Sequence, residues 1–489
     1  MAKHEQQAYE RLGAKVLTLP DVIAQSVGFM GPVFSSAFVI PLVIGVASPS
    51  GRGGGIATPL SVLIAAVGVF ALGWIVSRYA KEIHSAGSLY DYVSRGLGER
   101  IGTAAGWLYY AGVTILLTGL LLLIGGYVQG TLQSEFKINP LPSWAWTLIL
   151  IALIGAILYY GVRLSTRSQL ALALISIVVV AIFFIVVIIK LGSDNSLKPF
   201  NPGSAADGWS GIFFGVLYGV LMFVGFETAA NLAEETKNPR REIPVAVLAT
   251  AGIATVFFVL AAYVEVAGFN YDLKAITQAA GAPLFALGAP ESAGGYGGVW
   301  INRLLEFVVL LDMIAVAIGC AVASSRGVFA MARDRRLPAS LAVVSKKHGT
   351  PFGATVFVVA ASLATLAINQ WWTGLFALPG LPHFFSLFAW GSTFGGFALV
   401  VVYLLMSVGS LRSFGAAPGR GALIVAAVIG IVITAGAIYA SFYQVQAPTI
   451  YAPWGAVGLF VVGLLITFVL PGRQAARREL ADLGSRSTA

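Results

Sequence analysis

The sequence predicts an all-α protein that crosses a membrane many times. Of its 489 residues, 58% are hydrophobic and only 10% are charged, whereas soluble proteins average about 25% charged residues. Apolar runs of about 20 residues, the length needed to span a bilayer, recur along the whole chain. The basic residues lie in short segments between these runs, so the net charge of +9 reflects membrane topology and excludes a basic nucleic-acid-binding face.

Twelve membrane spans are predicted. They cover residues 19–47, 56–79, 104–131, 143–161, 169–191, 209–233, 244–268, 301–331, 353–370, 384–407, 421–442 and 453–470. If the N-terminus is cytoplasmic, the outside loops hold six of the 30 basic residues, namely Arg52, Lys137, Lys190, Lys198, Lys274 and Arg303. The other 24 lie inside, and this imbalance predicts a multi-pass protein of the cytoplasmic membrane with both tails, residues 1–18 and 471–489, in the cytoplasm.

Span 1 carries residues that interrupt a helix. Pro32 removes a backbone hydrogen bond and clashes with the preceding turn, and it stands close to Gly28 and Gly31. Two hydroxyl residues, Ser35 and Ser36, follow within one turn. We expect the helix to open near residues 28–36 and these five residues to line a binding site. Broken backbone at membrane depth survives only when it is buried in protein or lines a wet cavity.

Span 6 carries a carboxylate at its centre, in Phe223-Val224-Gly225-Phe226-Glu227. A charge at mid-membrane costs at least ~2.5 kcal/mol and usually faces a protein interior or a water-filled cavity. The glycines around it favour a local break, since each costs roughly 1 kcal/mol relative to Ala. The alternative is a continuous helix in which the glycines serve packing and Glu227 pairs with a neighbour.

The two weakened spans are five apart, and an odd repeat of five places its second copy upside down. Interrupted helices at corresponding positions of inverted repeats indicate the substrate site of a secondary transporter. We therefore expect a ten-span core at 19–407, with repeats at about 19–191 and 209–407, and two further spans within 421–470. Half-helix N-termini suit a carboxylate, and broken-helix carbonyls suit an ammonium or a metal cation. Phe223 and Phe226 either cap this site, since an aromatic face attracts ammonium, or simply pack.

Several motifs carry a family resemblance. Gly225-Phe226-Glu227 is followed by Ala-Glu-Glu-Thr-Lys-Asn-Pro-Arg-Arg-Glu-Ile-Pro at 233–244, and Ala323-Ser324-Ser325-Arg326 by Met331-Ala332-Arg333-Asp334. With Ala86-Gly87-Ser88-Leu89-Tyr90, these motifs resemble the amino acid-polyamine-organocation superfamily of permeases over roughly residues 15 to 410. The resemblance implies a five-plus-five inverted-repeat fold with two further helices, in which the unwound parts of spans 1 and 6 bind the substrate's amino and carboxylate groups.

Two departures from the family pattern concern the substrate carboxylate and the coupling ion. Members often show Gly-x-Gly in the span 1 break, where this chain has Ser35-Ser36-Ala37. Some proton-coupled members resemble one another in a span 5 lysine that replaces a sodium ion, but span 5 has no ionisable group here and Ser176 is the expected counterpart. The coupling ion is therefore left open between H⁺ and Na⁺. The other ion-coupling candidates are Asp312, Ser324 and Ser325, although an ion pair or a hydrogen-bonded structural role is an equal alternative for Asp312.

These observations predict a secondary active transporter that moves amino acids or related small amines by alternating access. The alternatives are a polyamine or organocation carrier, a transporter-like sensor and a channel. An enzyme is not expected, because the four histidines fall outside the spans and form no catalytic or metal-binding motif. No metal site or cofactor is expected either, and the single Cys320 excludes a disulfide within the chain.

Overall fold

The computed structural model describes residues 12, 15–46, 48, 51–279, 282–378, 382–414 and 419–469. Within these ranges the protein is helical, and extended pairing is limited to isolated bridges such as Leu17 with Thr236. The predicted C-terminal tail, 471–489, lies outside the described residues, as does most of the predicted N-terminal tail.

Nine helices among the described residues are long and apolar enough to cross a membrane. They are α5 (Thr58–Ala80), α7 (Glu99–Phe136), α8 (Ser143–Tyr160), α9 (Val162–Leu191), α11 (Pro239–Ala267), α14 (Val299–Arg333), α15 (Phe352–Trp371), α16 (His383–Ser413) and α17 (Arg420–Ala440). Two shorter apolar helices, α10 (Gly208–Met222) and α18 (Tyr451–Ile466), join them. Large apolar side chains such as Val256 and Ile189 are 70% exposed or more, as expected of a surface that faces lipid.

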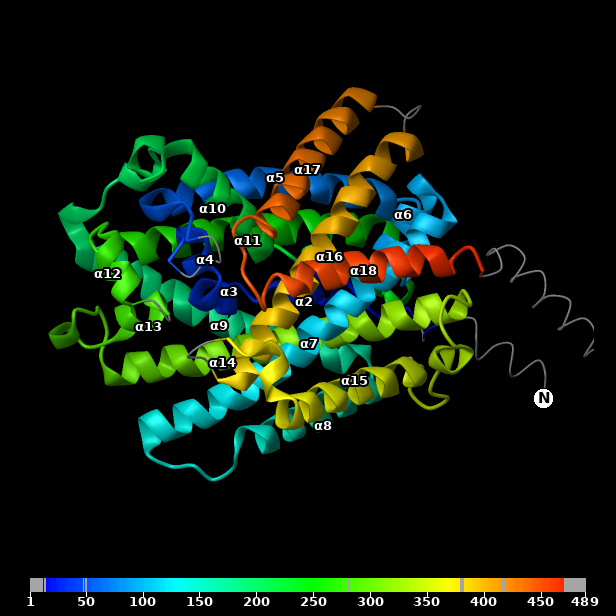
Figure 1. Ribbon diagram of the computed structural model, residues 1–489, viewed down its shortest axis with the longest axis horizontal. Coiled ribbons are helices and arrows are strands. Elements are labelled where there is room, and N and C mark those ends of the chain that lie inside the picture. Colours follow the sequence, from blue (N-terminus) through cyan, green and yellow to red (C-terminus); the bar gives the residue numbers. More distant parts are fainter. Residues whose placement is uncertain are drawn as a thin grey trace, which may run out of the picture.

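Shorter elements mark the two ends of the molecule. Helix α6 (Leu89–Leu97) lies at one end, whereas α12 (Leu273–Gln278) and α13 (Pro283–Gly288) lie at the other (Figure 1). We call these ends the α6 face and the α12 face. The segment between the second and third predicted spans contains α6, which packs against α7 and α16 and buries Tyr90 and Val93 completely.

The first predicted span is three short helices, α2 (Leu19–Met30), α3 (Pro32–Phe38) and α4 (Ile40–Ile44). The break between α2 and α3 is a single residue, Gly31, with φ +56°. It is narrower than the opening expected over 28–36, because Pro32 is the first residue of α3, where a missing N–H costs nothing and its fixed φ suits the helix.

The sixth predicted span is interrupted as well. Helix α10 ends at Met222, residues 223–227 form turns, and the chain continues as the 3₁₀ helix η5 (Thr228–Glu235). Gly225 has φ +109°, a conformation that favours glycine. A helix continued through this segment is therefore ruled out, and the interruption predicted from its glycines is confirmed.

The two breaks face each other inside the protein. The Ala229 amide of η5 donates to Ser26 Oγ of α2 at 2.9 Å. Helix α2 also packs against α9, α11 and α14, and α2 and α3 lie near the centre of the ribbon (Figure 1). The irregular backbone of the two breaks is thus enclosed by neighbouring helices. This enclosure is needed because the bilayer core holds no water that could bond to free backbone groups.

Candidate functional site

Glu227 is the carboxylate at the span 6 break, and it is completely buried. The Tyr109 hydroxyl of α7 donates to Oε1 at 2.6 Å, and the Tyr403 hydroxyl of α16 donates to Oε2 at 2.6 Å. The Gly225 amide donates to Oε2 at 3.2 Å. All three donors are neutral, so the alternative of an ion-paired Glu227 does not hold among the described residues. The carboxylate instead ties the broken segment to two long helices.

Asp312 of α14 is the carboxylate at the span 1 break. The amides of Val33 and Phe34, at the start of α3, donate to Asp312 Oδ2 at 2.9 and 2.8 Å. Asp312 is completely buried, and its Oδ1 has no hydrogen-bond partner among the described residues. Each break therefore has its own acidic side chain bound to the amides that helix interruption leaves free.

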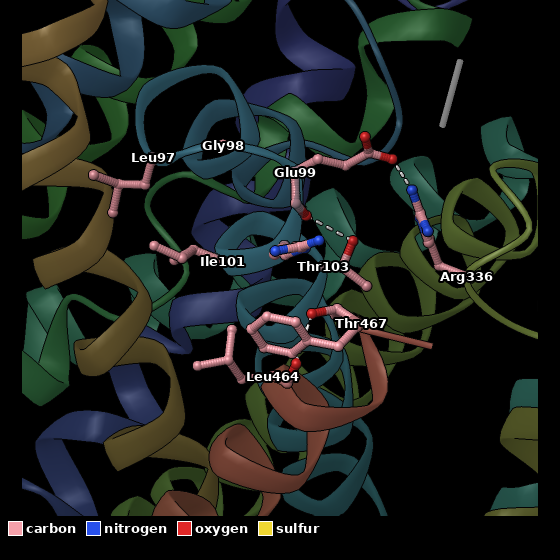
Figure 2. A pocket seen from close by; sticks show the side chains of 10 residues that line it. Leu97, Gly98, Glu99, Ile101, Thr103, Arg336, Leu464 and Thr467 are labelled. Carbon is pink, nitrogen blue, oxygen red and sulfur yellow. Dashed lines mark hydrogen bonds and ion pairs between the residues drawn. The ribbon is translucent and has the colours of Figure 1, made fainter. Parts of the chain in front are cut away.

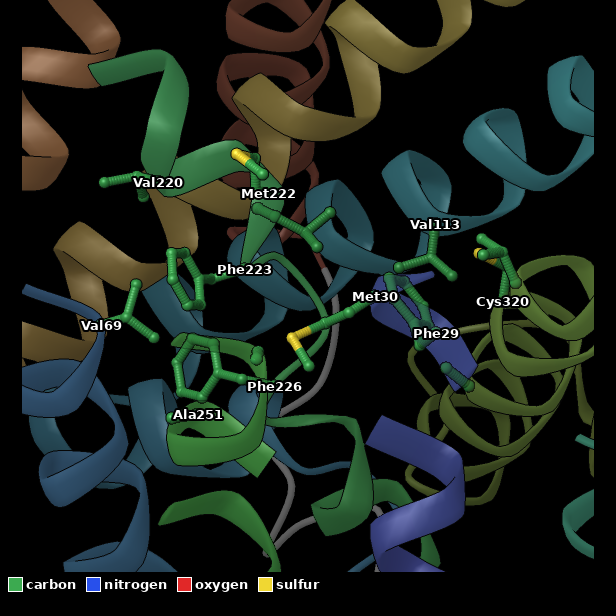
Figure 3. Packing of buried hydrophobic residues seen from close by; sticks show 14 of the residues in the cluster. Phe29, Met30, Val69, Val113, Val220, Met222, Phe223, Phe226, Ala251 and Cys320 are labelled. Atoms are coloured by element: carbon green, nitrogen blue, oxygen red, sulfur yellow. The ribbon is translucent and has the colours of Figure 1, made fainter. Parts of the chain in front are cut away.

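Apolar side chains fill the space between the breaks. Phe223 and Phe226 are at most 1% exposed, and Figure 3 shows them beside Met30 of α2. The Phe223 ring meets Phe258 edge-on at a centroid distance of 5.0 Å, and Phe226 lies 5.6 Å from the Tyr403 ring. Both phenylalanines therefore pack against neighbouring aromatic rings.

The predicted glycines and serines have structural contacts at the break. A Cβ at Gly31 would lie 2.2 Å from Val316 Cγ2, and one at Gly225 would lie 2.2 Å from Phe29 Cδ1. Ser35 Oγ donates to the Met30 carbonyl at 3.0 Å, and Ser36 Oγ donates to the Pro32 carbonyl at 2.9 Å. The Ser35 hydroxyl therefore braces the turn between α2 and α3, whereas the Ser36 bond lies within α3.

Gly28 lies inside α2, where a Cβ would be 2.1 Å from Gln169 Cγ. The Gln169 amide of α9 donates to the Ala315 carbonyl of α14 at 3.1 Å, so it wedges between α2 and α14. Ser176 of α9 donates to the Val308 carbonyl of α14 at 2.8 Å. Gln169 is thus a polar span 5 side chain that meets the first broken helix.

Two ion pairs lie between the breaks and the α6 face. Arg326 and Glu235 are both at least 97% buried, with Nε and Oε2 3.0 Å apart. Arg333 donates to both oxygens of Glu234, at 2.7 and 2.9 Å. The Glu235 carbonyl also accepts the Leu17 amide at 3.0 Å. The acidic and basic residues of the two family-like motifs therefore bind each other and link the chain before α2 to the end of η5.

The remaining serine candidates lie on the α6 side of the breaks. Ser324 shares a 2.6 Å hydrogen bond with Thr114 of α7. Ser325 accepts a hydrogen bond from Arg326 Nη1 at 3.2 Å. Ser325 thus supports the Arg326–Glu235 pair, and within the described part of the chain neither serine is hydrogen-bonded to Glu227 or Asp312.

Aromatic rings pack together between the breaks and the α12 face. Phe38 of α3 meets Tyr127 of α7 and Phe285 of α13 edge-on, at centroid distances of 6.5 and 6.4 Å. Phe34 meets Phe388 of α16 in the same manner at 6.1 Å. Both carboxylates are completely buried, so the breaks are closed to solvent in this structure.

A cavity of about 490 Å³ opens on the α6 face, between the start of α7 and the end of α18 (Figure 2). Its Glu99 and Arg336 form an ion pair with each other, and Arg100 lies 4.4 Å from the centre of the Phe468 ring. This cavity is remote from the two breaks. Among the described residues, no cluster of three or more His, Cys, Asp or Glu side chains has the arrangement of a metal site.

Three residues of the site were missed from the sequence. Tyr109 and Tyr403 hold Glu227 from helices distant in sequence, and tyrosines inside apolar spans give no local signal that distinguishes them from packing residues. Gln169 has a signal, because an amide inside an apolar helix must find partners. It lies at the predicted edge of span 5, where a polar residue is ordinary.

Comparisons with known proteins match this sequence to one family. A sequence model described as "Amino acid permease" matches residues 29–477. The branched-chain amino acid permease BcaP of Bacillus subtilis is 24% identical over 61% of this chain, and the match spans only 64% of that relative's length. The methylthioribose transporter of Bacillus subtilis is 25% identical, over 64% of this chain and 68% of that protein.

A similar fold is seen in a solved structure, the crystal structure of a single-residue mutant of the manganese transporter of Eremococcus coleocola. It matches with a TM-score of 0.58 and covers 94% of this chain and 97% of its own. Its sequence identity of 13% supports the fold alone.

Proposed function

Because the chain belongs to the amino acid permease family, we propose that it is a secondary active transporter that moves amino acids or related small amines across the cytoplasmic membrane. The observation that carries this proposal is the pair of interrupted spans whose free amides meet the buried carboxylates of Asp312 and Glu227. Discontinuous helices at the centre of a membrane bundle form the substrate site of secondary transporters. No catalytic activity is proposed.

The architecture proposed for this function is a ten-span core with two inverted repeats, at about 19–191 and 209–407, followed by two spans within 421–470. The broken pieces α2 to α4 and α10 with η5 are the first spans of the two repeats. In this proposal the substrate contacts the residues around the breaks, Gly28, Gly31, Pro32, Ser35, Ser36, Phe223, Gly225, Phe226 and Glu227. Coupling to H⁺ or Na⁺ involves Asp312, with Ser176, Ser324 and Ser325 as further candidates.

The contacts on the two sides of the breaks support alternating access as the mechanism. The Arg326–Glu235 pair and the Leu17–Thr236 bridge separate the breaks from the α6 face, and the rings around Phe38 separate them from the α12 face. A carrier opens one closure at a time, whereas a channel opens both together. We assign the α6 face to the cytoplasm because the basic loops gather there.

Counterflow in proteoliposomes tests this function. The purified protein is reconstituted, and uptake of labelled leucine and labelled putrescine is measured with and without the same unlabelled compound inside the vesicles. A carrier gives saturable uptake that is accelerated by internal substrate. Uptake that rises linearly with concentration and ignores internal substrate indicates a channel, and binding without flux indicates a sensor.

A further inference from the structure

The amide donors at the start of α3 are already occupied. Pro32 has no N–H, and the Ser35 amide donates to the Gly31 carbonyl at 2.8 Å. Only the amides of Val33 and Phe34 remain, and both donate to Asp312 Oδ2. These are the donors that a substrate carboxylate would use at a half-helix N-terminus. The side chain of Asp312 therefore takes the place of that carboxylate.

Four amides of the second break are occupied as well. The Gly225 amide donates to Glu227 Oε2, the Phe226 amide to the Phe223 carbonyl, and the Thr228 amide to the Gly225 carbonyl. The next residue, Ala229, donates to Ser26 Oγ. A substrate carboxylate that bound at any of these four amides would have to break a hydrogen bond before it formed one.

The two buried carboxylates at the breaks lack a cationic partner among the described residues. Asp312 Oδ1 is buried and unpartnered among the described residues, and Glu227 is bound only by neutral donors. The buried guanidinium of Arg326 already pairs with Glu235. A buried carboxylate without a cation is costly, and an ammonium group is the ligand that would reduce this cost.

Space at α3 also argues against a second carboxylate. A Cβ on Gly31 would lie 2.2 Å from Val316 Cγ2 and 3.3 Å from Asp312 Oδ2. The start of α3 is thus packed directly onto α14, with Asp312 in the contact. An α-carboxylate fits at this position only after Asp312 has left it.

We propose that Asp312 is a specificity residue and that the substrate is an organic ammonium cation without an α-carboxylate. This inference rests on the proposed transport function and narrows its substrate class from amino acids and amines to amines. In it, Asp312 Oδ2 occupies the α3 amides and Oδ1 accepts from the substrate ammonium, so that Asp312 serves the substrate and ion coupling is left to the other candidates. Membership of the family is compatible with this, because a relative at the same level of identity is named for methylthioribose, a sugar that has no carboxylate.

Matched pairs of an amino acid and its decarboxylated amine test the inference on the wild-type protein. The pairs are ornithine with putrescine and leucine with isoamylamine, each used in thermal-shift binding and as competitor of labelled uptake. We expect the amine to bind at least about tenfold more tightly than its amino acid, the ratio that corresponds to one charge-assisted hydrogen bond. An amino acid that binds as tightly as its amine overturns the inference and leaves the transport function standing. If neither member of any pair binds or is transported, the proposed function fails and the inference fails with it.

The Asp312→Ala variant tests the same inference by a change of preference. It frees the Val33 and Phe34 amides, so we expect amine binding to weaken at least about tenfold and amino acid binding to appear. Glu306→Gln is the matched control, since Glu306 lies on the same helix, is only half-buried and accepts from Asn302. It should keep the wild-type preference. Loss of amine and amino acid binding together in a folded Asp312→Ala variant contradicts the assigned role, and an unfolded variant leaves the decision to the wild-type pairs.

Discussion

Replacing Glu227 by Gln should leave a folded protein and slow transport by roughly ten- to a hundredfold. The carboxylate accepts hydrogen bonds of 2.6 Å from Tyr109 and Tyr403 and one of 3.2 Å from the Gly225 amide. A glutamine keeps one acceptor and turns the other into an NH₂ donor, which faces a hydroxyl or an amide donor. At least one charge-assisted hydrogen bond is lost, worth about 1.5–3 kcal/mol, and each 1.4 kcal/mol added to the transport barrier slows the rate about tenfold.

Folding should tolerate this change because Glu227 has no cationic partner among the described residues that would be stranded in the interior. The assay is initial uptake of labelled putrescine and leucine by wild type and variant at equal protein density, with the melting temperature as the folding control. Glu291→Gln is the matched control, since that carboxylate pairs with Lys190 on the exposed α12 face. Unchanged uptake by Glu227→Gln would remove Glu227 from the mechanism, and a lost melting transition would assign it a structural role.

Three further predictions concern topology, backbone strain and the buried ion pair. A cysteine in place of the exposed Lys237 should react with an impermeant thiol reagent only after the membrane is opened. Reaction in intact cells would show that this loop lies outside and that the assigned topology is reversed. Gly225→Ala should destabilise the protein by roughly 2–5 kcal/mol, because it adds backbone strain and a clash with Phe29, whereas Gly98→Ala, which has φ +94° and open space, should cost only the strain. Equal losses of melting temperature would refute the clash. Glu235→Gln should cost roughly 3–5 kcal/mol, because it leaves the buried charge of Arg326 without a carboxylate partner. The double variant Glu235→Leu with Arg326→Met should recover most of that loss in the same melting assay, and a double variant as unstable as the single one would contradict this reason.

The breaks were predictable because their causes are local. Pro32 and Gly31 impose a turn that no tertiary contact is needed to explain, and Glu227 is marked by its cost in an apolar span. The extent of the first break was overestimated, because proline at the first position of a new helix requires only one non-helical residue before it.

The partners of these residues were not predictable from local patterns. Asp312 meets amides 278 and 279 positions earlier in the chain, and nothing in span 8 distinguishes this contact from an ion pair. Glu234 and Glu235 fall in a predicted cytoplasmic loop, yet they bind arginines of α14. Tertiary pairing of this kind depends on how helices pack, which hydropathy does not encode.

The proposed carrier must separate Leu17 from Thr236 whenever the breaks open to the α6 face. These residues pair as a parallel bridge, and paired backbone segments run about 4.8 Å apart, within the Cα separation that a disulfide spans. A Leu17→Cys, Thr236→Cys variant in proteoliposomes should lose putrescine uptake on oxidation and regain it on reduction, while each variant with only one of these two substitutions stays active under both conditions. Undiminished uptake by fully cross-linked protein would show that this closure does not open during transport and would contradict alternating access at the two breaks.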